Sequence, residues 1–262
     1  MEIILLLLVA FGAAMLTFFS GFGLGTILMP VFAIFFPVEV AIALTAIVHL
    51  FNNLFKLVLI WKQIVWRIAV LFALPAALAA IPGAILLNRL SSDVILYTYE
   101  IGSRSFDLSL IKLIIGILLI VFAIIEIDKR FEQYSFGKGS LPYGGLLSGF
   151  FGGLSGHQGA LRSMFLIRAG LSKEGFIATG IVTAVVVDIS RLSVYGTSFF
   201  GQYFAELTDD KSIVMVIISC LAAFAGSFIG RRFLKRVTFR WVQLIVGLLI
   251  LVMGLSLVAG LI

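Results

Sequence analysis

Ten apolar runs follow one another along almost the whole chain, and they constrain the fold more than any other feature. The runs are residues 3–19, 26–36, 39–60, 64–87, 109–127, 143–156, 159–169, 174–199, 212–234 and 240–261. About 20 apolar residues in a helix are enough to cross the hydrocarbon core of a bilayer. Charged residues make up only 12% of the chain, roughly half the share found in soluble domains. The sequence therefore predicts an all-α polytopic membrane protein.

Two of these runs, 26–36 and 159–169, are too short to span a bilayer, and each follows a cluster of glycines. The clusters contain Gly21, Gly23 and Gly25 in SGFGLG, and Gly152, Gly153, Gly156 and Gly159 in GGLSGHQG. Short, glycine-interrupted apolar segments at corresponding places of two halves indicate the binding site of a transporter. We therefore expect one broken helical hairpin in each half of the chain.

The two halves correspond when the sequence is shifted by 135 positions. This shift places Ser20-Gly21 on Ser155-Gly156, Glu39 on Glu174, Ala43 on Ala178, Asn53 on Asp188 and Lys56 on Arg191. An internal repeat explains these matches. We expect a first transmembrane repeat over residues 1–127, a linker over 128–142 and a second transmembrane repeat over 143–262. The polar insert 91–107 has no equivalent in the second half, and we expect it to form a loop.

The placement of basic residues favours one topology. If each broken hairpin enters the membrane and returns to the same face, one side of the membrane receives Lys56, Lys62, Arg67, Lys129, Arg130, Lys138, Arg168, Lys173, Arg231, Arg232, Lys235, Arg236 and Arg240. Basic loops mark the cytoplasmic side, so both termini are expected outside. Three crossings per repeat remain, and an odd number inverts the second repeat relative to the first. The expected fold is two inverted structural repeats, each with a glycine-broken helical hairpin plus three transmembrane helices.

The glycine breaks predict a polar cavity, because unpaired backbone at membrane depth needs protein or water to satisfy it. The helices that begin near Thr26 and Ala160 would aim free N–H groups and a partial positive charge inward. Two such helix starts at mid-depth would suit an anion.

The second break adds four polar side chains to this expected site. We expect Arg162 to supply charge, Gln158 and Ser163 to donate hydrogen bonds, and His157 to donate or to titrate near neutral pH. In the alternative interpretation, Arg162 lies nearer the interface and extends its charge to water, while His157 bonds a backbone carbonyl.

A further polar set lies in the second helix of each repeat. His49, Asn52 and Asn53 are candidates for substrate binding, and Lys56, Asp188 and Arg191 are candidates for coupling or for an ion pair. Asp188 and Arg191 are three residues apart and share a helix face. Two interpretations stay open for Asp188: a carrier of a coupling proton, or half of an internally neutralised pair. For His49 and Asn52 the alternative is an interhelical hydrogen bond.

Other kinds of site lack support in the sequence. Two histidines and one cysteine, Cys220, show no metal-ligand spacing. GFGLGT lacks the lysine of a phosphate-binding loop, and the GxSxG pattern of a nucleophile elbow is absent. The basic residues lie at the ends of apolar runs, which explains the net charge of +6 without nucleic acid. We expect no enzyme, no cofactor and no metal.

The segments SGFGLGTILMP and GLLSGFFGGLSGHQGALRSMFL, the latter leading into GLSKEGFIATG, resemble the sulfite exporter TauE/SafE family. This family is also called the toluene sulfonate uptake permease family, and the resemblance covers nearly the whole chain. It implies a bacterial or archaeal inner-membrane permease for sulfur-containing or carboxylate anions such as sulfite, sulfoacetate or related sulfonates. It also implies that Gly21 to Thr26 and Gly156 to Arg162 line the substrate site.

The function that we expect is secondary transport, in the export direction, of sulfite or an organosulfonate. Transport would proceed by alternating access at a midplane site between the repeats. Two alternatives stay open. One is a passive anion channel, and the other is a membrane component of a sulfur-relay pathway, for which Cys220 is the only candidate carrier.

Overall fold

The computed structural model describes residues 2–20, 24–90, 94–102, 104–128, 130, 136–167, 169–202, 209–233 and 239–262. Each predicted apolar run is a helix within these residues. The helices are α1 (Glu2–Ser20), α2 (Gly25–Ala33), α3 (Val38–Ile60), α4 (Trp66–Leu90), α5 (Leu110–Ile127), α7 (Leu141–Ser155), α8 (Gly159–Leu166), α9 (Lys173–Gln202), α11 (Asp210–Phe233) and α12 (Phe239–Val258). Two short 3-10 helices, η1 (Trp61–Gln63) and η2 (Lys138–Ser140), join longer ones.

Five of the helical segments in the described part are long and apolar enough to cross a membrane. They are Val38–Gln63, Trp66–Leu90, Leu110–Ile127, Lys173–Thr197 and Asp210–Arg232. The predicted multi-pass helical architecture is therefore confirmed. The short helices α2 and α8 follow the two glycine clusters, as expected from the length of their apolar runs.

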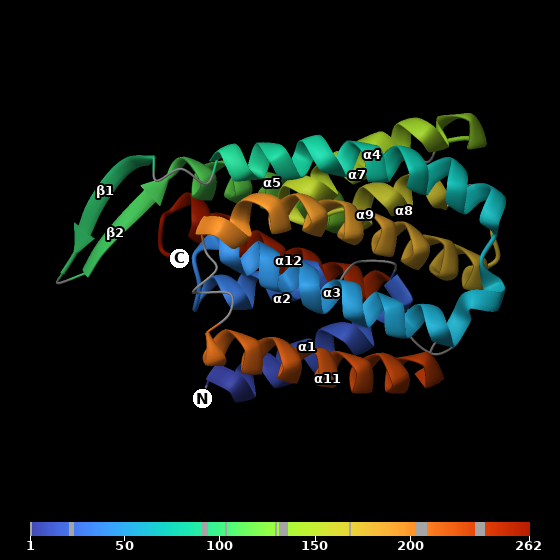
Figure 1. Ribbon diagram of the computed structural model, residues 1–262, viewed down its shortest axis with the longest axis horizontal. Coiled ribbons are helices and arrows are strands. Elements are labelled where there is room, and N and C mark those ends of the chain that lie inside the picture. The colour runs from blue at the N-terminus through green and yellow to red at the C-terminus, as the bar shows by residue number, and fades with distance from the viewer. Residues whose placement is uncertain are drawn as a thin grey trace.

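The prediction of a loop over residues 91–107 was wrong. An antiparallel hairpin of β1 (Ile95–Ile101) and β2 (Arg104–Ser109) occupies most of this insert. Aromatic residues favour strands because they pack across a pleated surface, and here the Tyr99 ring stacks on those of Tyr97 and Phe106. Gly102 adopts a φ of 65° between the strands, which a glycine tolerates without strain. The hairpin projects from one end of the helical bundle (Figure 1).

Small residues allow the helices of the two sequence halves to pack closely. On α7 and on α4 they recur every fourth residue, on one face of each helix. A Cβ atom at Gly145, Gly149 or Gly153 of α7 would come within 2.3, 2.0 or 2.1 Å of the carbonyl oxygens of Phe72, Ala76 and Ala80, respectively. Such close contact between backbones is the usual way in which helices associate in membranes. α1 packs on α11 in the same manner, with Gly226 against the carbonyl oxygen of Phe11.

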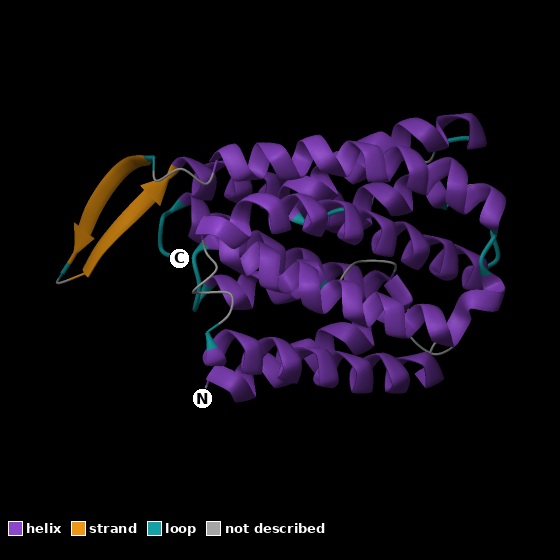
Figure 2. Ribbon diagram, viewed as in Figure 1, coloured by secondary structure: helices purple, strands orange, loops and turns teal. Residues whose placement is uncertain are grey.

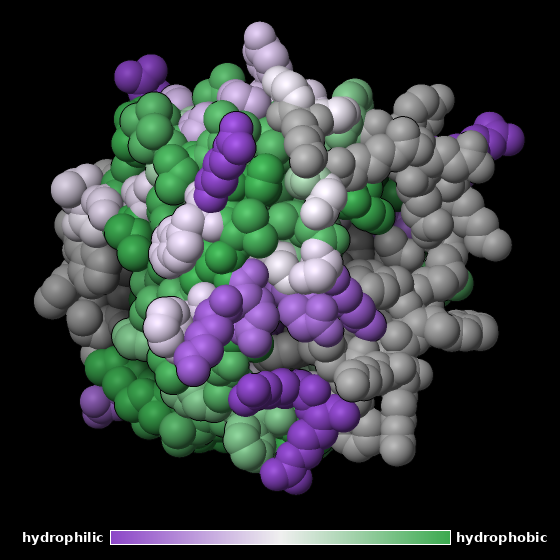
Figure 3. Space-filling view, turned by 90° about the vertical axis from the view of Figure 1, so that its right-hand side faces the viewer, coloured by the Kyte–Doolittle hydropathy of each residue, from purple (hydrophilic) through white to green (hydrophobic). Residues whose placement is uncertain are grey.

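The helices run between two ends of the bundle. The N and C termini and the β-hairpin lie at one end, and α3, α4 and α9 extend from there to the opposite end (Figure 1). The turn between α7 and α8 does not reach either end, and Figure 2 shows it as a short loop inside the bundle. Figure 3 looks onto the end opposite the termini, where hydrophilic side chains gather on a largely apolar face. Exposed residues of this end include Lys62, Gln63, Arg67, Lys173 and Glu174.

Candidate functional site

The turn after α7 requires a glycine for two independent reasons. Gly156 ends the helix with a φ of 81°, and its N–H donates to the Gly152 carbonyl at 3.0 Å. A side chain in this left-handed conformation is strained. A Cβ atom would also lie 2.8 Å from Nη1 of Arg191. The second glycine break thus brings the backbone directly against a buried arginine of α9.

Side chains cap the carbonyl groups that the end of α7 leaves open. The last carbonyls of a helix have no partner within it, and unsatisfied backbone is costly at membrane depth. Tyr195 of α9 donates its hydroxyl to the Gly153 carbonyl at 2.5 Å, and Nδ1 of His157 lies 2.8 Å from the Ser155 carbonyl. His157 therefore bonds a backbone carbonyl, as the alternative interpretation of this residue had it. Its ring also stacks on that of Phe122.

Gln158 and Ser163 have polar side-chain atoms without a hydrogen-bond partner among the described residues. Gln158 is 1% exposed, and neither its side-chain nitrogen nor its oxygen has a hydrogen-bond partner among the residues that the structure describes. Oγ of Ser163 is also buried and has no hydrogen-bond partner in the described part of the chain. Only the backbone of Gln158 is held, since Ser148 Oγ donates to its carbonyl at 3.0 Å. A buried amide without partners is unusual, and a polar solute would satisfy it.

Arg162 is buried one turn beyond Gln158 and lies against α9. Arg162 is only 5% exposed, so its side chain does not extend to water. A Cβ atom at Gly180 would lie 3.3 Å from Arg162 Nε, which means that a glycine of α9 makes room for the guanidinium. Arg162 is therefore buried inside the protein, and its role as a charge that binds an anion stays a prediction.

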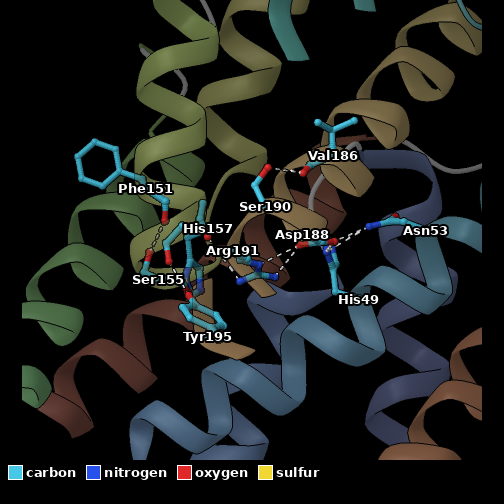
Figure 4. A network of polar contacts seen from close by, with 12 residues as sticks. His49, Asn53, Phe151, Ser155, His157, Val186, Asp188, Ser190, Arg191 and Tyr195 are labelled. Atoms are coloured by element: carbon cyan, nitrogen blue, oxygen red, sulfur yellow. Dashed lines mark hydrogen bonds and ion pairs between the residues drawn. The ribbon is translucent and has the colours of Figure 1, made fainter. Parts of the chain in front are cut away.

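An ion-pair network joins α3 to α9 at the centre of the bundle (Figure 4). His49 Nδ1 lies 2.6 Å from Asp188 Oδ2, while Arg191 donates to Asp188 Oδ1 from Nε at 3.0 Å and from Nη2 at 2.7 Å. Arg191 Nη1 also reaches the Gly152 carbonyl at 3.5 Å. Asp188 and Arg191 are 0% and 1% exposed. Both carboxylate oxygens are thus engaged, which is the geometry of an internally neutralised pair.

The other polar residues of α3 surround this network. The Asn53 amide nitrogen lies 3.1 and 3.2 Å from the two ring nitrogens of His49. Asn52 bonds Ser227 of α11 at 2.8 Å. With its amide oriented so that the nitrogen donates to Ser227 Oγ and to the Ala223 carbonyl, the Asn52 oxygen accepts from Lys56 Nζ at 3.3 Å. We adopt this orientation because it gives each group a complementary partner. Asn52 therefore makes an interhelical hydrogen bond.

The first glycine break approaches the same network. Gly21 and Gly23 lie outside the described residues, but Gly25 begins α2. A Cβ atom at Gly25 would lie 3.4 Å from Thr45 Cγ2 and 3.8 Å from His49 Cδ2. Thr26 follows it and is 4% exposed. Gly25 thus contacts one end of the His49–Asp188–Arg191 network, and Gly156 contacts the other.

Sequence reasoning missed several residues of this region. Tyr195 lies one turn after Arg191 on the same face of α9, so the helical spacing contained a signal. The sequence contained no signal for Gly180, Ser148 or Ser227, because the importance of these residues depends on which helix packs against them. The pairing of His49 with Asp188 joins residues 139 positions apart, which helical periodicity does not reveal.

Comparison with known families agrees with the architecture. A family model described as Sulfite exporter TauE/SafE matches residues 6–257, nearly the whole chain. The chain belongs to the sulfite exporter TauE/SafE family. Its similarity to TauE/SafE proteins, expected from the two glycine segments, is thereby confirmed, and TauE/SafE membership makes it a multi-pass membrane transporter. No curated protein and no solved structure matches the chain.

Proposed function

We propose that this protein is a secondary transporter that exports small anions, sulfite or an organosulfonate, by alternating access at a site between its two halves. The observation that carries the proposal is the meeting of both glycine-broken segments at one buried, cation-rich network. Gly25 lies against His49, and Gly156 lies against Arg191. Transporter sites are typically formed where discontinuous helices of two repeats meet near the bilayer midplane.

The charge balance of this region favours an anion. Lys56, Arg162 and Arg191 are all buried there, and Asp188 is the buried carboxylate beside them. The other buried carboxylates in the described part, Glu39 and Glu126, lie in the first turn of α3 and the last turn of α5. Three buried cations beside one buried carboxylate give these four side chains a positive balance, and a positive environment favours a negatively charged solute.

The pairing of helices supports two transmembrane repeats, over residues 1–127 and 143–262, with a linker over 128–142. The correspondence pairs each helix of the first half with one of the second: α1 with α7, α2 with α8, α3 with α9, α4 with α11 and α5 with α12. Each contact between two helices then has a counterpart between the two corresponding helices. α1 packs on α11 as α7 packs on α4; α4 packs on α9 as α11 packs on α3; and α2 packs on α12 as α8 packs on α5. Inverted repeats that exchange in this way give a transporter two equivalent conformations, one open to each side.

The protein is proposed to lie in the cytoplasmic (inner) membrane of a bacterium or archaeon, with both termini outside. Exposed Lys62, Arg67 and Lys173 lie at the end opposite the termini, and such basic residues favour the cytoplasmic side. The coupling ion is proposed to be a proton. The proposed site consists of the polar residues and glycines of the two breaks and of α3 and α9, namely Gly25, Thr26, His49, Asn52, Asn53, Lys56, Gly156, His157, Gln158, Gly159, Arg162, Ser163, Asp188 and Arg191.

Counterflow with purified protein in liposomes tests this function. Vesicles loaded with unlabelled sulfite should transiently accumulate labelled sulfite from outside, because an alternating-access carrier exchanges solutes. Sulfoacetate, thiosulfate and acetate, tested as competitors, would rank the substrates. A passive channel would show no counterflow, and its flux would follow the membrane potential alone. Cys220→Ser should transport normally, since Cys220 lies in the apolar core with Ala222 and Ala223; loss of transport would favour the sulfur relay.

Arg162→Ala should reduce counterflow at least ~100-fold while the protein remains folded, because the variant removes a buried charge that the anion is proposed to contact. The measurement is the initial rate of counterflow, with size-exclusion chromatography as the check on folding. Arg67→Ala is the matched control, since Arg67 is an exposed arginine in the first turn of α4. Transport by Arg162→Ala at the rate of this control would refute the role of Arg162.

A further inference from the structure

The side chain of Gln158 is a buried carboxamide with two unsatisfied ends. The residue is 1% exposed, and neither Nε2 nor Oε1 has a hydrogen-bond partner among the described residues. A carboxamide nitrogen donates hydrogen bonds, and a carboxamide oxygen accepts them. Turning the amide by 180° exchanges the two atoms, but one end still needs an acceptor and the other a donor. A solute that satisfies Gln158 must therefore both accept and donate.

Packing places this amide at the turn between α7 and α8. A Cβ atom at Gly152 would lie 3.1 Å from Gln158 Cβ and 3.5 Å from Gln158 Cδ, so the glycine leaves room for the side chain. The Gln158 carbonyl is held separately, by the hydroxyl of Ser148 at 3.0 Å. Arg191 Nη1 donates to the Gly152 carbonyl at 3.5 Å. The amide thus lies where the second glycine break meets the buried ion-pair network.

The start of α8 beside the amide suits a negative charge. Gln158 is the N-cap residue of this eight-residue helix, and its side chain makes no capping hydrogen bond with any described residue. The first N–H groups of a helix have no partner within the helix and carry a partial positive charge. An anion at this turn would therefore be stabilised by the helix start and by the donor end of the amide. The acceptor end, Oε1, would still need a donor.

The preceding residue offers a second acceptor. His157 Nδ1 lies 2.8 Å from the Ser155 carbonyl, and because a carbonyl only accepts, Nδ1 carries the hydrogen. Nε2 is then the acceptor of the neutral imidazole, and this buried atom has no partner in the described part of the chain. Two consecutive residues of the turn therefore present acceptors to which none of the described groups donates.

The candidate substrates differ in whether they carry a donor. Sulfite, thiosulfate and the sulfonates present oxygens that only accept hydrogen bonds when they are fully ionised. Hydrogen sulfite, the protonated form that is in equilibrium with sulfite near neutral pH, has one hydroxyl and two further oxygens. A buried acceptor left unpaired costs about 1–3 kcal/mol. Of these anions, hydrogen sulfite satisfies both ends of the Gln158 amide.

We propose that the site binds hydrogen sulfite, and that Gln158 selects this ion by accepting from its hydroxyl and donating to one of its other oxygens. This inference rests on the proposed transport function and chooses sulfite over the organosulfonates. The coupling proton then travels on the substrate, so each ion carries one proton and one negative charge across the membrane. No side chain has to gain or lose a proton, which agrees with the engagement of both Asp188 oxygens by His49 and Arg191.

Isothermal titration calorimetry of the purified protein tests this selection. Methanesulfinate is the matched anion, because a methyl group takes the place of the hydroxyl of hydrogen sulfite while the charge stays the same. In anaerobic buffer at about pH 6, hydrogen sulfite should bind at least ~10-fold more tightly than methanesulfinate, which leaves the acceptor end of Gln158 unpaired.

The pH dependence of binding gives a second measurement. As the pH rises from about 6 to 9, sulfite loses its proton, so the apparent dissociation constant for total sulfite should rise, by about tenfold per pH unit at the alkaline end. Methanesulfinate keeps its charge over this range, so its affinity reports any titration of the protein. The ratio of the two affinities should therefore follow the fraction of hydrogen sulfite.

Variants of Gln158 separate selection from folding. Gln158→Leu should bind the two anions with affinities within ~3-fold of each other, because it removes the acceptor. Without anion its unfolding midpoint should stay the same or rise, since a buried amide without a partner is lost. Gln158→Met, with an unbranched side chain that adapts to the same space, carries the same expectation. Gln63→Leu changes an exposed glutamine of η1 and should keep the preference.

Three outcomes would overturn the inference and leave sulfite transport intact. They are equal binding of hydrogen sulfite and methanesulfinate by the unmodified protein, the same pH profile for both anions, and a preference that survives in Gln158→Leu and Gln158→Met. If the preference survives and the unfolding midpoint falls, the amide binds a structural water instead. A protein that binds neither anion and shows no sulfite counterflow would refute the proposed function itself, so the two failures are distinguishable.

Discussion

Gly156 shows how one residue links the break in a helix to the charges beside it. Its positive φ ends α7, and the absence of a side chain lets the Arg191 guanidinium lie against the turn. Arg191 in turn holds Asp188, which holds His49 on α3. A substitution at this glycine therefore disturbs both the backbone and the ion-pair network.

Gly156→Ala should lower the stability of the protein by about 2 kcal/mol or more, because the left-handed conformation costs a non-glycine residue roughly 1–2 kcal/mol and the methyl group displaces Arg191. The measurement is the midpoint of thermal unfolding in detergent. Gly12→Ala is the control: an added Cβ at Gly12 in α1 would meet no atom of another described segment within 4 Å, so alanine should be neutral or slightly stabilising there. Equal unfolding midpoints for both variants would contradict the prediction.

At this scale the sequence revealed local pairs and missed distant ones. Asp188 and Arg191 were predicted to share a helix face from their spacing alone, and they form an ion pair at 2.7 Å. The partner on α3 was not predictable, because nothing in the periodicity of one helix tells which residue of another it faces. The role of Tyr195 follows only once α7 is known to end beside it.

At the scale of elements, α7 depends on its glycines to reach α4. Gly145, Gly149 and Gly153 form one face, and the backbone of α4 lies directly upon it. This contact fixes the depth at which the α7–α8 turn enters the bundle. The position of the buried turn therefore depends more on the packing of α7 against α4 than on the residues of the turn.

Gly149→Ala should separate the two helices, because the new methyl group would meet the Ala76 carbonyl oxygen at 2.0 Å and its Cα at 2.5 Å. Backbone atoms have little freedom to move away, and overpacking typically costs about 1–3 kcal/mol. We expect a lower unfolding midpoint and a lower initial rate of sulfite counterflow, since Gln158 and Arg162 would shift with the hairpin. An unchanged midpoint would show that α4 and α7 pack less closely than described.

The helices were predictable as elements, and the β-hairpin was not. Apolar runs interrupted by glycine specify where helices begin and end, because the bilayer requires backbone groups to bond within the segment. The insert over 91–107 was judged by its polarity, although ILYTYEI contains aromatic residues typical of a strand. Outside the membrane, polarity alone does not separate a loop from an exposed hairpin.

At the scale of the whole molecule, the arrangement predicts which end faces the cytoplasm. Single cysteines introduced into a Cys220→Ser background test this with a membrane-impermeant maleimide on intact cells. Glu100→Cys, on the exposed β-hairpin, should be labelled from outside, and Lys62→Cys should be labelled only after the cells are permeabilised. The reverse pattern would invert the proposed topology without affecting the fold.

The hydrogen bonds from α9 to the end of α7 predict which parts of the protein would move together in the proposed transport mechanism. Tyr195 and Arg191 bind successive carbonyls of α7, while the glycine face of the same helix rests on α4. These three helices are therefore expected to rotate as one rigid body. Under the proposed alternating-access mechanism, the 2.6 Å contact between His49 of α3 and Asp188 of α9 would have to change if this body rotates relative to α3. We therefore expect the His49 imidazole to contribute to the energy barrier between the inward-open and outward-open forms.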